Sequence, residues 1–161
     1  MSIERKRSGF TLVEILIVVI ILGILAAIII PQFSDASTEA RESTLTSNLQ
    51  ILRSQVGLYK IQHLDEYPDS TVDSATFEAG LTTQTDDLGD ASTDPDALGP
   101  YMQKVPNNPF TTNAAHPFFT FGGLDTDAAD DSHWFFNTVT GAIIANDGGT
   151  APDSVTLHSS Y

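Results

Sequence analysis

The sequence contains no cysteine among its 161 residues. This absence excludes disulfide bonds, thiolate metal sites, a cysteine nucleophile and a lipoprotein-type anchoring cysteine. Positive charge is scarce beyond residue 65, where Lys104 stands alone against fifteen acidic residues, and the formal net charge of the chain is −14. Because a surface this acidic repels phosphate groups, we expect no direct binding of nucleic acid.

Polar side chains are missing altogether from residues 15–30. The apolar run begins at Phe10, and at ~1.5 Å per residue a helix over residues 10–30 is roughly 32 Å long, enough to cross a bilayer core of ~30 Å. Three bases precede the run, namely Arg5, Lys6 and Arg7. Since positive charge stays on the cytoplasmic side, we predict a cytoplasmic N-terminus and an extracytoplasmic chain after Pro31.

A secretory signal peptide and a plain membrane anchor are two ordinary explanations of such a segment. The run is longer than the ~7–15 apolar residues usual in a signal peptide. Neither explanation accounts for Glu14, because a carboxylate inside an apolar span is destabilising and requires a partner. No cation lies near Glu14 in the apolar run. The carboxylate therefore indicates a function beyond anchoring.

The residues around this carboxylate resemble a known processing signal. The run GFTLVE at residues 9–14, after a short basic leader and before the apolar run and Pro31, is similar to the N-terminus of type IV pilin-like proteins. These include pilins and the pseudopilins of type II secretion systems. The resemblance implies a leader at 1–9, a transmembrane and assembly helix at 10–31, its amphipathic continuation at 32–66 and a globular extracytoplasmic head at 67–161.

The resemblance also implies a role for individual residues. In this family a prepilin peptidase cuts after the glycine that corresponds to Gly9 and methylates the new amine, here on Phe10. The carboxylate that corresponds to Glu14 pairs with the N-terminal amine of a neighbouring subunit. The stretch from Gly23 to Pro31 is expected to unwind partly in the filament, because proline kinks or opens a helix; the alternative is that Pro31 simply ends the membrane span.

The chain from Gln32 to Leu64 reads as a helix with one apolar stripe. Its apolar residues recur at helical spacing and are Leu45, Leu49, Leu52, Val56 and Tyr59. We expect this stripe to pack on the sheet of the head, polar residues such as Glu42 to lie mostly off it, and the segment Glu66–Asp69 to end the helix at its proline.

Short aromatic and β-branched runs in the C-terminal part of the sequence predict a small sheet. Residues 69–99 predict a loop with a short helix at Ser74–Leu81. Strands are predicted at Pro117–Phe121, Trp134–Asn137 and Gly141–Asn146, the last two as a hairpin. The fold class is therefore α+β, pilin-like, with a long N-terminal helix packed on a small antiparallel sheet.

Two further segments suggest binding roles. The run at Leu98–Phe110, with GPY, KVP and NPF, is similar to a segment of major pseudopilins. An acidic run then offers oxygen ligands for Ca²⁺, a cation bound near this region in those proteins, with Asp125, Asp127, Asp130 and Asp131 as the candidate ligands. The alternative is a set of solvated turn residues. Trp134 is expected in the core, with carbohydrate binding as its alternative.

Catalysis has little support. The histidines are scattered without zinc-binding spacing and are His63, His116, His133 and His158. We expect His133 to decorate the end of a strand. The chain also lacks a GxSxG elbow and a phosphate-binding loop. A structural protein is therefore favoured over an enzyme.

The sequence thus predicts a structural subunit of a type IV pilin-like filament, acting in type II protein secretion. Its expected partners are further copies of the chain, the prepilin peptidase, an inner-membrane assembly platform and other pseudopilins. The expected location is the bacterial inner membrane, with the head in the periplasm. Two alternatives are a pilin of a surface pilus used in adhesion, motility or DNA uptake, and an anchored binding module that never polymerises. No cofactor is expected beyond the candidate Ca²⁺.

Overall fold

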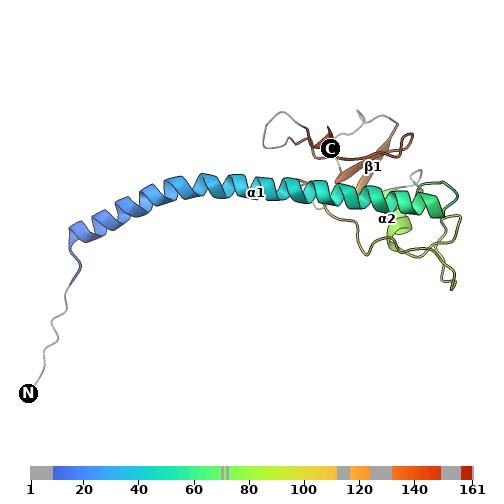
Figure 1. Ribbon diagram of the computed structural model, residues 1–161, viewed down its shortest axis with the longest axis horizontal. Helices are drawn as coiled ribbons and strands as arrows, with labels where there is room; N and C mark the ends of the chain where they lie inside the picture. The colour runs from blue at the N-terminus through green and yellow to red at the C-terminus, as the bar shows by residue number, and fades with distance from the viewer. Residues whose placement is uncertain are drawn as a thin grey trace, which may run out of the picture. The chain divides into compact units, whose positions relative to one another are not determined.

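The computed structural model describes residues 9–69, 71, 73–111, 117–123, 132–149 and 157–160. Its elements, in chain order, are α1 (Leu12–Gln62), α2 (Ser74–Thr82), β1 (Phe119–Gly122), β2 (Trp134–Asn137), β3 (Ile143–Ala145) and the short 3₁₀ helix η2 (His158–Ser160). The chain forms two compact units, the first ending at Thr38 and the second beginning at Glu39. The second unit holds the C-terminal half of α1, α2 and the sheet, as Figure 1 shows.

The helix α1 ends earlier than predicted. Its last residue is Gln62, and the chain leaves the helix through Leu64 and Asp65, whose φ angles are 52° and 70°. The amide of Asp65 donates to the Lys60 carbonyl at 3.0 Å, which satisfies a carbonyl at the helix end. The predicted helix end near Leu64 is thus confirmed to within two residues, but a left-handed turn stops the helix before the proline of the segment Glu66–Asp69 is reached.

The predicted apolar stripe of α1 is confirmed as the helix side of the core. All five stripe residues are buried, and they pack with residues of α2 and the sheet, chiefly Phe77, Leu81, Phe119, Trp134 and Phe136. Glu42 is also buried, contrary to the prediction that it lies off the stripe. It precedes Leu45 by three residues, so helical spacing extends the stripe through Glu42.

The helix α2 confirms the predicted helix at Ser74–Leu81 to within one residue. Its N-cap is Asp73, whose Oδ1 accepts a hydrogen bond from the Thr76 amide at 2.8 Å. This bond satisfies one of the amides that a helix N-terminus leaves without an intrahelical partner. The cap fixes the start of α2, whose Phe77 and Leu81 enter the core.

The sheet has the order β1-β2-β3, but it is not antiparallel throughout. The hairpin of β2 and β3 is antiparallel as predicted, with Phe135 opposite Ile144. In contrast, β1 runs parallel to β2, with Phe119 opposite Trp134. A parallel neighbour requires a connection that returns to the starting end of the sheet, and in sequence residues 123–133 separate β1 from β2. The prediction of a wholly antiparallel sheet is corrected accordingly.

Candidate functional site

The first turn of α1 is closed by Thr11 and Glu14. Glu14 Oε2 accepts hydrogen bonds from the Thr11 amide and the Thr11 hydroxyl, both at 2.8 Å, and the Glu14 amide donates to Thr11 Oγ1 at 3.2 Å. This is a capping box, in which two side chains satisfy each other's backbone amides. The T-x-x-E spacing is visible in the sequence, and our sequence analysis missed it. Among the described residues, Glu14 Oε1 has no hydrogen-bond partner.

Gly9 and Phe10 lie just before this cap, outside any regular element. Both are exposed, Phe10 by 81 % of its surface, and apart from the two chain neighbours no atom of the described residues lies within 4 Å of the position that a Cβ on Gly9 would take. The peptide bond between them is therefore accessible from outside the folded chain. Glu14 follows one helical turn later, so the three residues that the motif singles out lie along one short segment.

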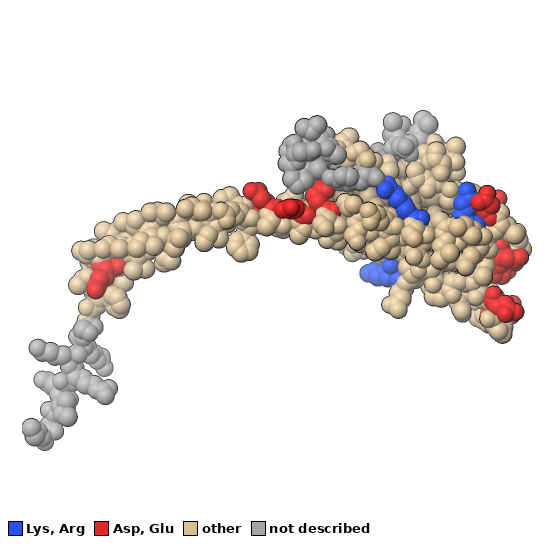
Figure 2. Space-filling model, in the orientation of Figure 1, with Lys and Arg blue, Asp and Glu red and all other residues tan. Residues whose placement is uncertain are grey.

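The helix from Leu12 to Ile30 presents apolar side chains on every side. Each of its large hydrophobic residues is exposed by 45 % or more. In the part of the chain that the structure describes, α1 is the one helix long and apolar enough to cross a membrane. Figure 2 shows acidic atoms, in red, near the start of α1, followed by a length of helix surface without charge. In the sequence, residues 15–34 contain no charged side chain. The single carboxylate at Glu14 therefore stands at one edge of a large apolar surface.

Gly23 and Pro31 do not interrupt α1, which is helical through both. No atom lies within 4 Å of the position of a Cβ on Gly23. The pyrrolidine of Pro31 cannot donate the usual backbone hydrogen bond, so this turn is held by one bond fewer. Unwinding of the stretch from Gly23 to Pro31 stays a prediction, since it concerns the filament and not the single chain.

The polar residues at the end of α1 form a structural cluster in the core. The His63 ring stacks on Tyr59 at 3.6 Å, and its Nε2 lies 2.9 Å from Thr85 Oγ1. Burial raises the pKa of Tyr59 to about 12, and Tyr101 and then Asp86 act in the same direction. The Tyr59 phenol is therefore neutral at physiological pH, and with the buried His63 ring it forms part of the packed interior of the head.

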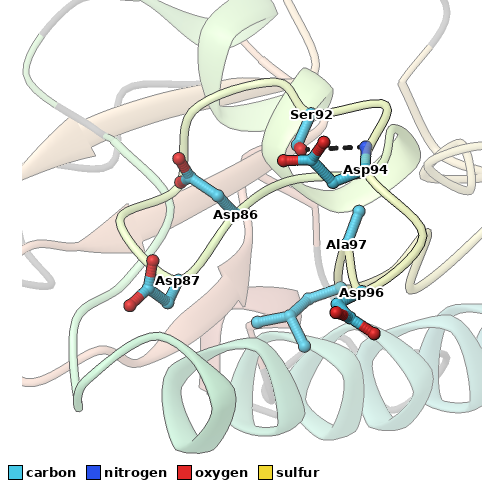
Figure 3. A pocket seen from close by; sticks show the side chains of 7 residues that line it. Asp86, Asp87, Ser92, Asp94, Asp96 and Ala97 are labelled. Atoms are coloured by element: carbon cyan, nitrogen blue, oxygen red, sulfur yellow. Dashed lines mark hydrogen bonds between the residues drawn. The ribbon is translucent and has the colours of Figure 1, made fainter.

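An acidic hollow of about 300 Å³ lies in the loop after α2 (Figure 3). Its lining includes Asp86, Asp87, Asp94 and Asp96. Asp86 Oδ1 accepts from the amides of Leu88 and Asp90 at 3.0 and 2.9 Å, so this carboxylate closes the loop on itself. Within the described residues, no group of three histidine or acidic side chains has the geometry to hold a metal ion. The candidate Ca²⁺ ligands Asp125, Asp127, Asp130 and Asp131 lie outside the described residues.

Trp134 is fully buried, and its indole N–H donates to the Pro106 carbonyl at 2.8 Å. The expected core position is confirmed, and the ring has no free face for a sugar. His133 lies directly before β2, at the strand end where we expected it; it is buried, and its Nδ1 accepts from the Asn108 backbone amide at 3.1 Å. The proline-rich segment Leu98–Phe110 is thus tied to the sheet by side chains of its residues and of β2.

A third buried histidine, His158, contacts two carboxylates, and the sequence analysis did not predict these contacts. His158 in η2 lies between Glu42 of α1 and Asp147, two residues after β3, with ring-nitrogen to oxygen distances of 2.6 and 2.7 Å. Glu42 and His158 are 116 residues apart. The position of Glu42 on the apolar stripe was the one available signal.

Comparison with known proteins identifies the N-terminal segment. The family model described as "Prokaryotic N-terminal methylation motif" matches residues 5–30. "Type II secretion system core protein G" of Pseudomonas aeruginosa is 36 % identical over 67 residues, which cover 42 % of this chain and 46 % of that protein. The protein of the same name from Aeromonas hydrophila is 29 % identical over 109 residues, 66 % of this chain and 70 % of that protein.

A second kind of relative has a different name. A "Fimbrial protein" of Pseudomonas aeruginosa is 31 % identical over 81 residues, 50 % of this chain and 53 % of that protein. The chain thus spans about half the length of two of these three relatives. No solved structure matches the chain. The motif lies on the cap and apolar helix described above; this chain is therefore a protein with the prokaryotic N-terminal methylation motif, and proteins named type II secretion system core protein G are among its relatives.

Proposed function

We propose that this chain is a structural subunit of a pilin-like filament that acts in type II protein secretion as a pseudopilin. The observation that carries the proposal is the apolar helix from Leu12 to Ile30, which is exposed on every side and begins with the single carboxylate of Glu14. A surface of this kind requires lipid before assembly and other copies of the helix after it. The relatives named core protein G support the secretion system over other settings.

Processing would create the partner of Glu14. A prepilin peptidase would cut after Gly9, remove the three bases of the leader and leave a methylated amine on Phe10. This amine is a cation at neutral pH. It would pair with Glu14 of a neighbouring subunit, so that neither charge stays uncompensated in the apolar filament core. Two observations support these steps: the exposed Gly9–Phe10 bond, and Glu14 Oε1, which has no hydrogen-bond partner among the residues that the structure describes.

The capping box also orients the Glu14 carboxylate for contact with a neighbouring subunit. In the single chain its Oε2 is held by Thr11, which fixes the rotamer of the carboxylate and keeps one oxygen engaged. The other oxygen would then receive the amine of the neighbour. Because only one axial position brings that amine to the carboxylate, the pair would set the register between adjacent helices.

The remaining parts follow from this assignment. The N-terminus would be cytoplasmic before cleavage and the head periplasmic, with α1 anchored in the inner membrane. An assembly platform and further pseudopilins would add subunits. The stretch from Gly23 to Pro31 would unwind as a subunit enters the filament. The protein would act by polymerising and would catalyse no reaction.

The test is the mass of the mature protein in a host with its assembly machinery. We expect a wild-type chain that begins at methylated Phe10 and is recovered in filaments. Gly9→Val places a branched side chain at the cleavage point and should leave the leader attached, whereas Gly23→Val, inside α1 and away from the cleavage point, should still be processed. A mature chain that begins elsewhere would overturn the proposal.

A surface pilus is the second candidate, because the fimbrial relative matches half of the chain. Electron microscopy of the cell envelope distinguishes the two, since a pseudopilus is short and periplasmic and a pilus extends beyond the cell. A secretion assay in a strain lacking the gene adds an independent readout. Loss of secretion supports the first candidate, and loss of surface filaments with normal secretion supports the second. A processed chain that stays monomeric beside intact machinery would favour an anchored binding module.

A further inference from the structure

The head part of α1 has two further stripes of side chains beside its buried one. The buried stripe includes Leu52, Val56 and Tyr59, which have the helical spacing i, i+4, i+7. One position further along the chain at each step comes a neighbouring stripe, and two positions further comes another. Their members are Arg53, Gly57 and Lys60 in the first and Ser54, Leu58 and Ile61 in the second. We call these six residues the basic–apolar face.

The two bases of this face are not neutralised within the described part of the chain. The Arg53 guanidinium donates from Nε and Nη2 to the Ile143 carbonyl at 3.0 and 2.7 Å, and it forms no ion pair with the described residues. Lys60 lies 3.7 Å from Asp65, whose side chain is 87 % exposed. A surface ion pair of this kind is weak. Both bases can therefore pair with further carboxylates.

The apolar side chains next to these bases are open to solvent. Leu58 is 40 % exposed and Ile61 is 80 % exposed. Gly57 lies between them and the bases, and it adds no side chain, so the helix surface stays low at this point. The face therefore offers hydrocarbon next to positive charge. Such a surface is complementary to an apolar side chain that has acidic neighbours.

The loop after α2 presents an apolar side chain of this kind. Residues 86–90, which we call the acidic loop, read DDLGD, and Leu88 is 75 % exposed. Asp87 and Asp90 on either side of it are exposed as well. Asp86 closes the loop, because its Oδ1 accepts from two amides of the loop and its own amide donates to the Asp90 carbonyl at 2.8 Å. Leu88 thus lies on a backbone that is already fixed, which lowers the entropic cost of binding.

Other exposed apolar residues of the head match the basic–apolar face less well. Val139 is 76 % exposed and Leu157 is 52 % exposed, but no acidic residue lies within two positions of either one. Leu64 is exposed next to Asp65, but this carboxylate already lies 3.7 Å from Lys60 of its own chain. The acidic loop is therefore the segment whose charge and apolar surface both fit the face.

The acidic loop is held away from the basic–apolar face of its own chain. A Cβ at Gly89 would lie 2.6 Å from the Tyr59 hydroxyl oxygen, so the loop packs against Tyr59. Tyr59 and Gly57 are two positions apart, and such positions point about 160° apart around a helix axis. The loop is thus fixed on the side of α1 away from Gly57. An acidic loop that occupies the face comes from another copy.

We propose that the acidic loop of one copy docks on the basic–apolar face of a second copy. Leu88 covers Leu58 and Ile61 above Gly57, and the acids beside Leu88 pair with the two bases of the face. The loop and the face are different parts of the chain, so each copy offers both, and the contact repeats from copy to copy without closing. This inference rests on the proposed function, because a contact this small requires copies that are already held side by side.

Disulfide cross-linking of the full-length protein tests the contact, in cells that contain the assembly machinery. The chain has no cysteine, so Gly57→Cys combined with Leu88→Cys supplies its only thiols. A disulfide requires Cα atoms within about 7 Å of each other. After mild oxidation we expect a ladder of linked multimers on a non-reducing gel, because each copy is linked to two others. Either single variant alone should give no linked product, and the two single variants expressed together should give linked dimers.

Two further combinations serve as a repeat and as a control. Ile61→Cys with Leu88→Cys repeats the measurement at a residue that is exposed and does not contribute to the core, so the fold is preserved. Gly57→Cys with Val139→Cys places the second thiol on an exposed apolar residue without acidic neighbours, and it should give no ladder.

Charge reversal tests the electrostatic part of the contact. Asp87→Lys with Asp90→Lys, added to the cross-linking variant, should lower the linked fraction about five- to ten-fold, since exposed ion pairs are replaced by like-charge contacts. Asp94→Lys with Asp96→Lys makes the same change of charge beyond the acidic loop and should leave the linked fraction unchanged.

The proposal is overturned if neither Gly57→Cys nor Ile61→Cys forms a link with Leu88→Cys, or if the Val139→Cys control is linked to the same extent. It is also overturned if the product is a dimer only, which indicates a symmetric contact, or if mass spectrometry finds the link to a different protein. Filaments without these links would remove the contact and leave the proposed function in place. Links between copies in cells that form no filament would support the contact and count against the proposed function.

Discussion

The helix α1 contains two apolar stretches, of which one is exposed and the other is buried in the core of the head. From Leu12 to Ile30 every large hydrophobic side chain is exposed, whereas from Leu45 to Tyr59 one stripe is buried in the core. Leu22 is 58 % exposed and Leu49 is 0 % exposed, although the two residues have the same side chain and lie in the same helix. The difference lies in what each stretch finds within its own chain.

The second stretch finds its partners in the head. It alternates apolar and polar residues at helical period, so one face is left for water, and α2 and the sheet cover the other. The first stretch is apolar on all sides, a pattern that no single surface can cover. Its partners must surround it, as lipid or neighbouring helices do. Composition along one helix thus separates what this chain buries alone from what it buries with others.

The largest expected effect tests the partners of the first stretch. Glu14→Gln keeps the size of the side chain and its ability to accept from Thr11, but it removes the charge that would pair with a neighbour's amine. We expect insertion and processing to proceed and filaments to be lost altogether. Immunogold microscopy of the envelope, with mass spectrometry of the membrane fraction, measures both. The control is Glu39→Gln, which lies on the same helix beyond the apolar stretch; normal filaments from Glu14→Gln would contradict the role of the charge.

The next effect compares the two stretches directly. Leu49→Ala should lower the free energy of unfolding of the head by about 2–5 kcal/mol, since it removes a fully buried side chain and leaves a cavity. Leu22→Ala should leave it unchanged. Denaturant unfolding in micelles, followed by the fluorescence of Trp134, reports the head alone because this is the single tryptophan and it is buried. Equal losses in the two variants would mean that the first stretch is part of the folded core.

Much of this comparison could be predicted from the sequence, because it depends on local periodicity. The stripe from Leu45 to Tyr59, the short helix at Ser74 and the strand Trp134–Asn137 all follow from the spacing of neighbouring residues. The GFTLVE run at residues 9–14 likewise carries the motif that the family model matches. Each of these signals lies within one element, where pattern and propensity act together.

What could not be predicted depends on residues distant in the chain. The parallel pairing of β1 with β2 could not be predicted, because the alternation of side chains within a strand is the same for parallel and antiparallel neighbours. The burial of Glu42 is compensated by His158, 116 residues away, and a charged residue is ordinarily assigned to the surface. In contrast, the capping box of Thr11 and Glu14 was predictable, because its T-x-x-E spacing is local to the sequence.

A smaller effect compares the two glycines of α1. Both Gly23 and Gly57 lie inside the helix, and apart from the chain neighbours and the backbone of the helix itself no described atom lies within 4 Å of the Cβ position of either residue. Gly57→Ala should raise the stability of the head by about 0.5–1 kcal/mol, because glycine loses more backbone entropy than alanine in a helix. Gly23→Ala should leave the free energy of unfolding of the head, measured by Trp134 fluorescence, unchanged. A loss of stability in Gly57→Ala would show that this position needs the space.

The smallest effect concerns how the stability of the N-terminal turn of α2 depends on pH. The hydrogen bond that the Thr76 backbone amide donates to the Asp73 carboxylate is the main reason why the pKa of Asp73 lies below its ordinary value. A carboxylate with a lowered pKa stabilises the fold above its unfolded pKa, at about pH 4, and loses this contribution as the pH falls through the folded pKa. Hydrogen exchange of Thr76 should therefore accelerate on acidification below about pH 4, after correction for its intrinsic rate. Asp73→Asn keeps the oxygen acceptor of the cap and does not titrate, so the same amide should lose its pH dependence. If the Thr76 amide still accelerates in acid when Asp73→Asn is present, another carboxylate of the head controls α2, and the cap is not the acid-sensitive point.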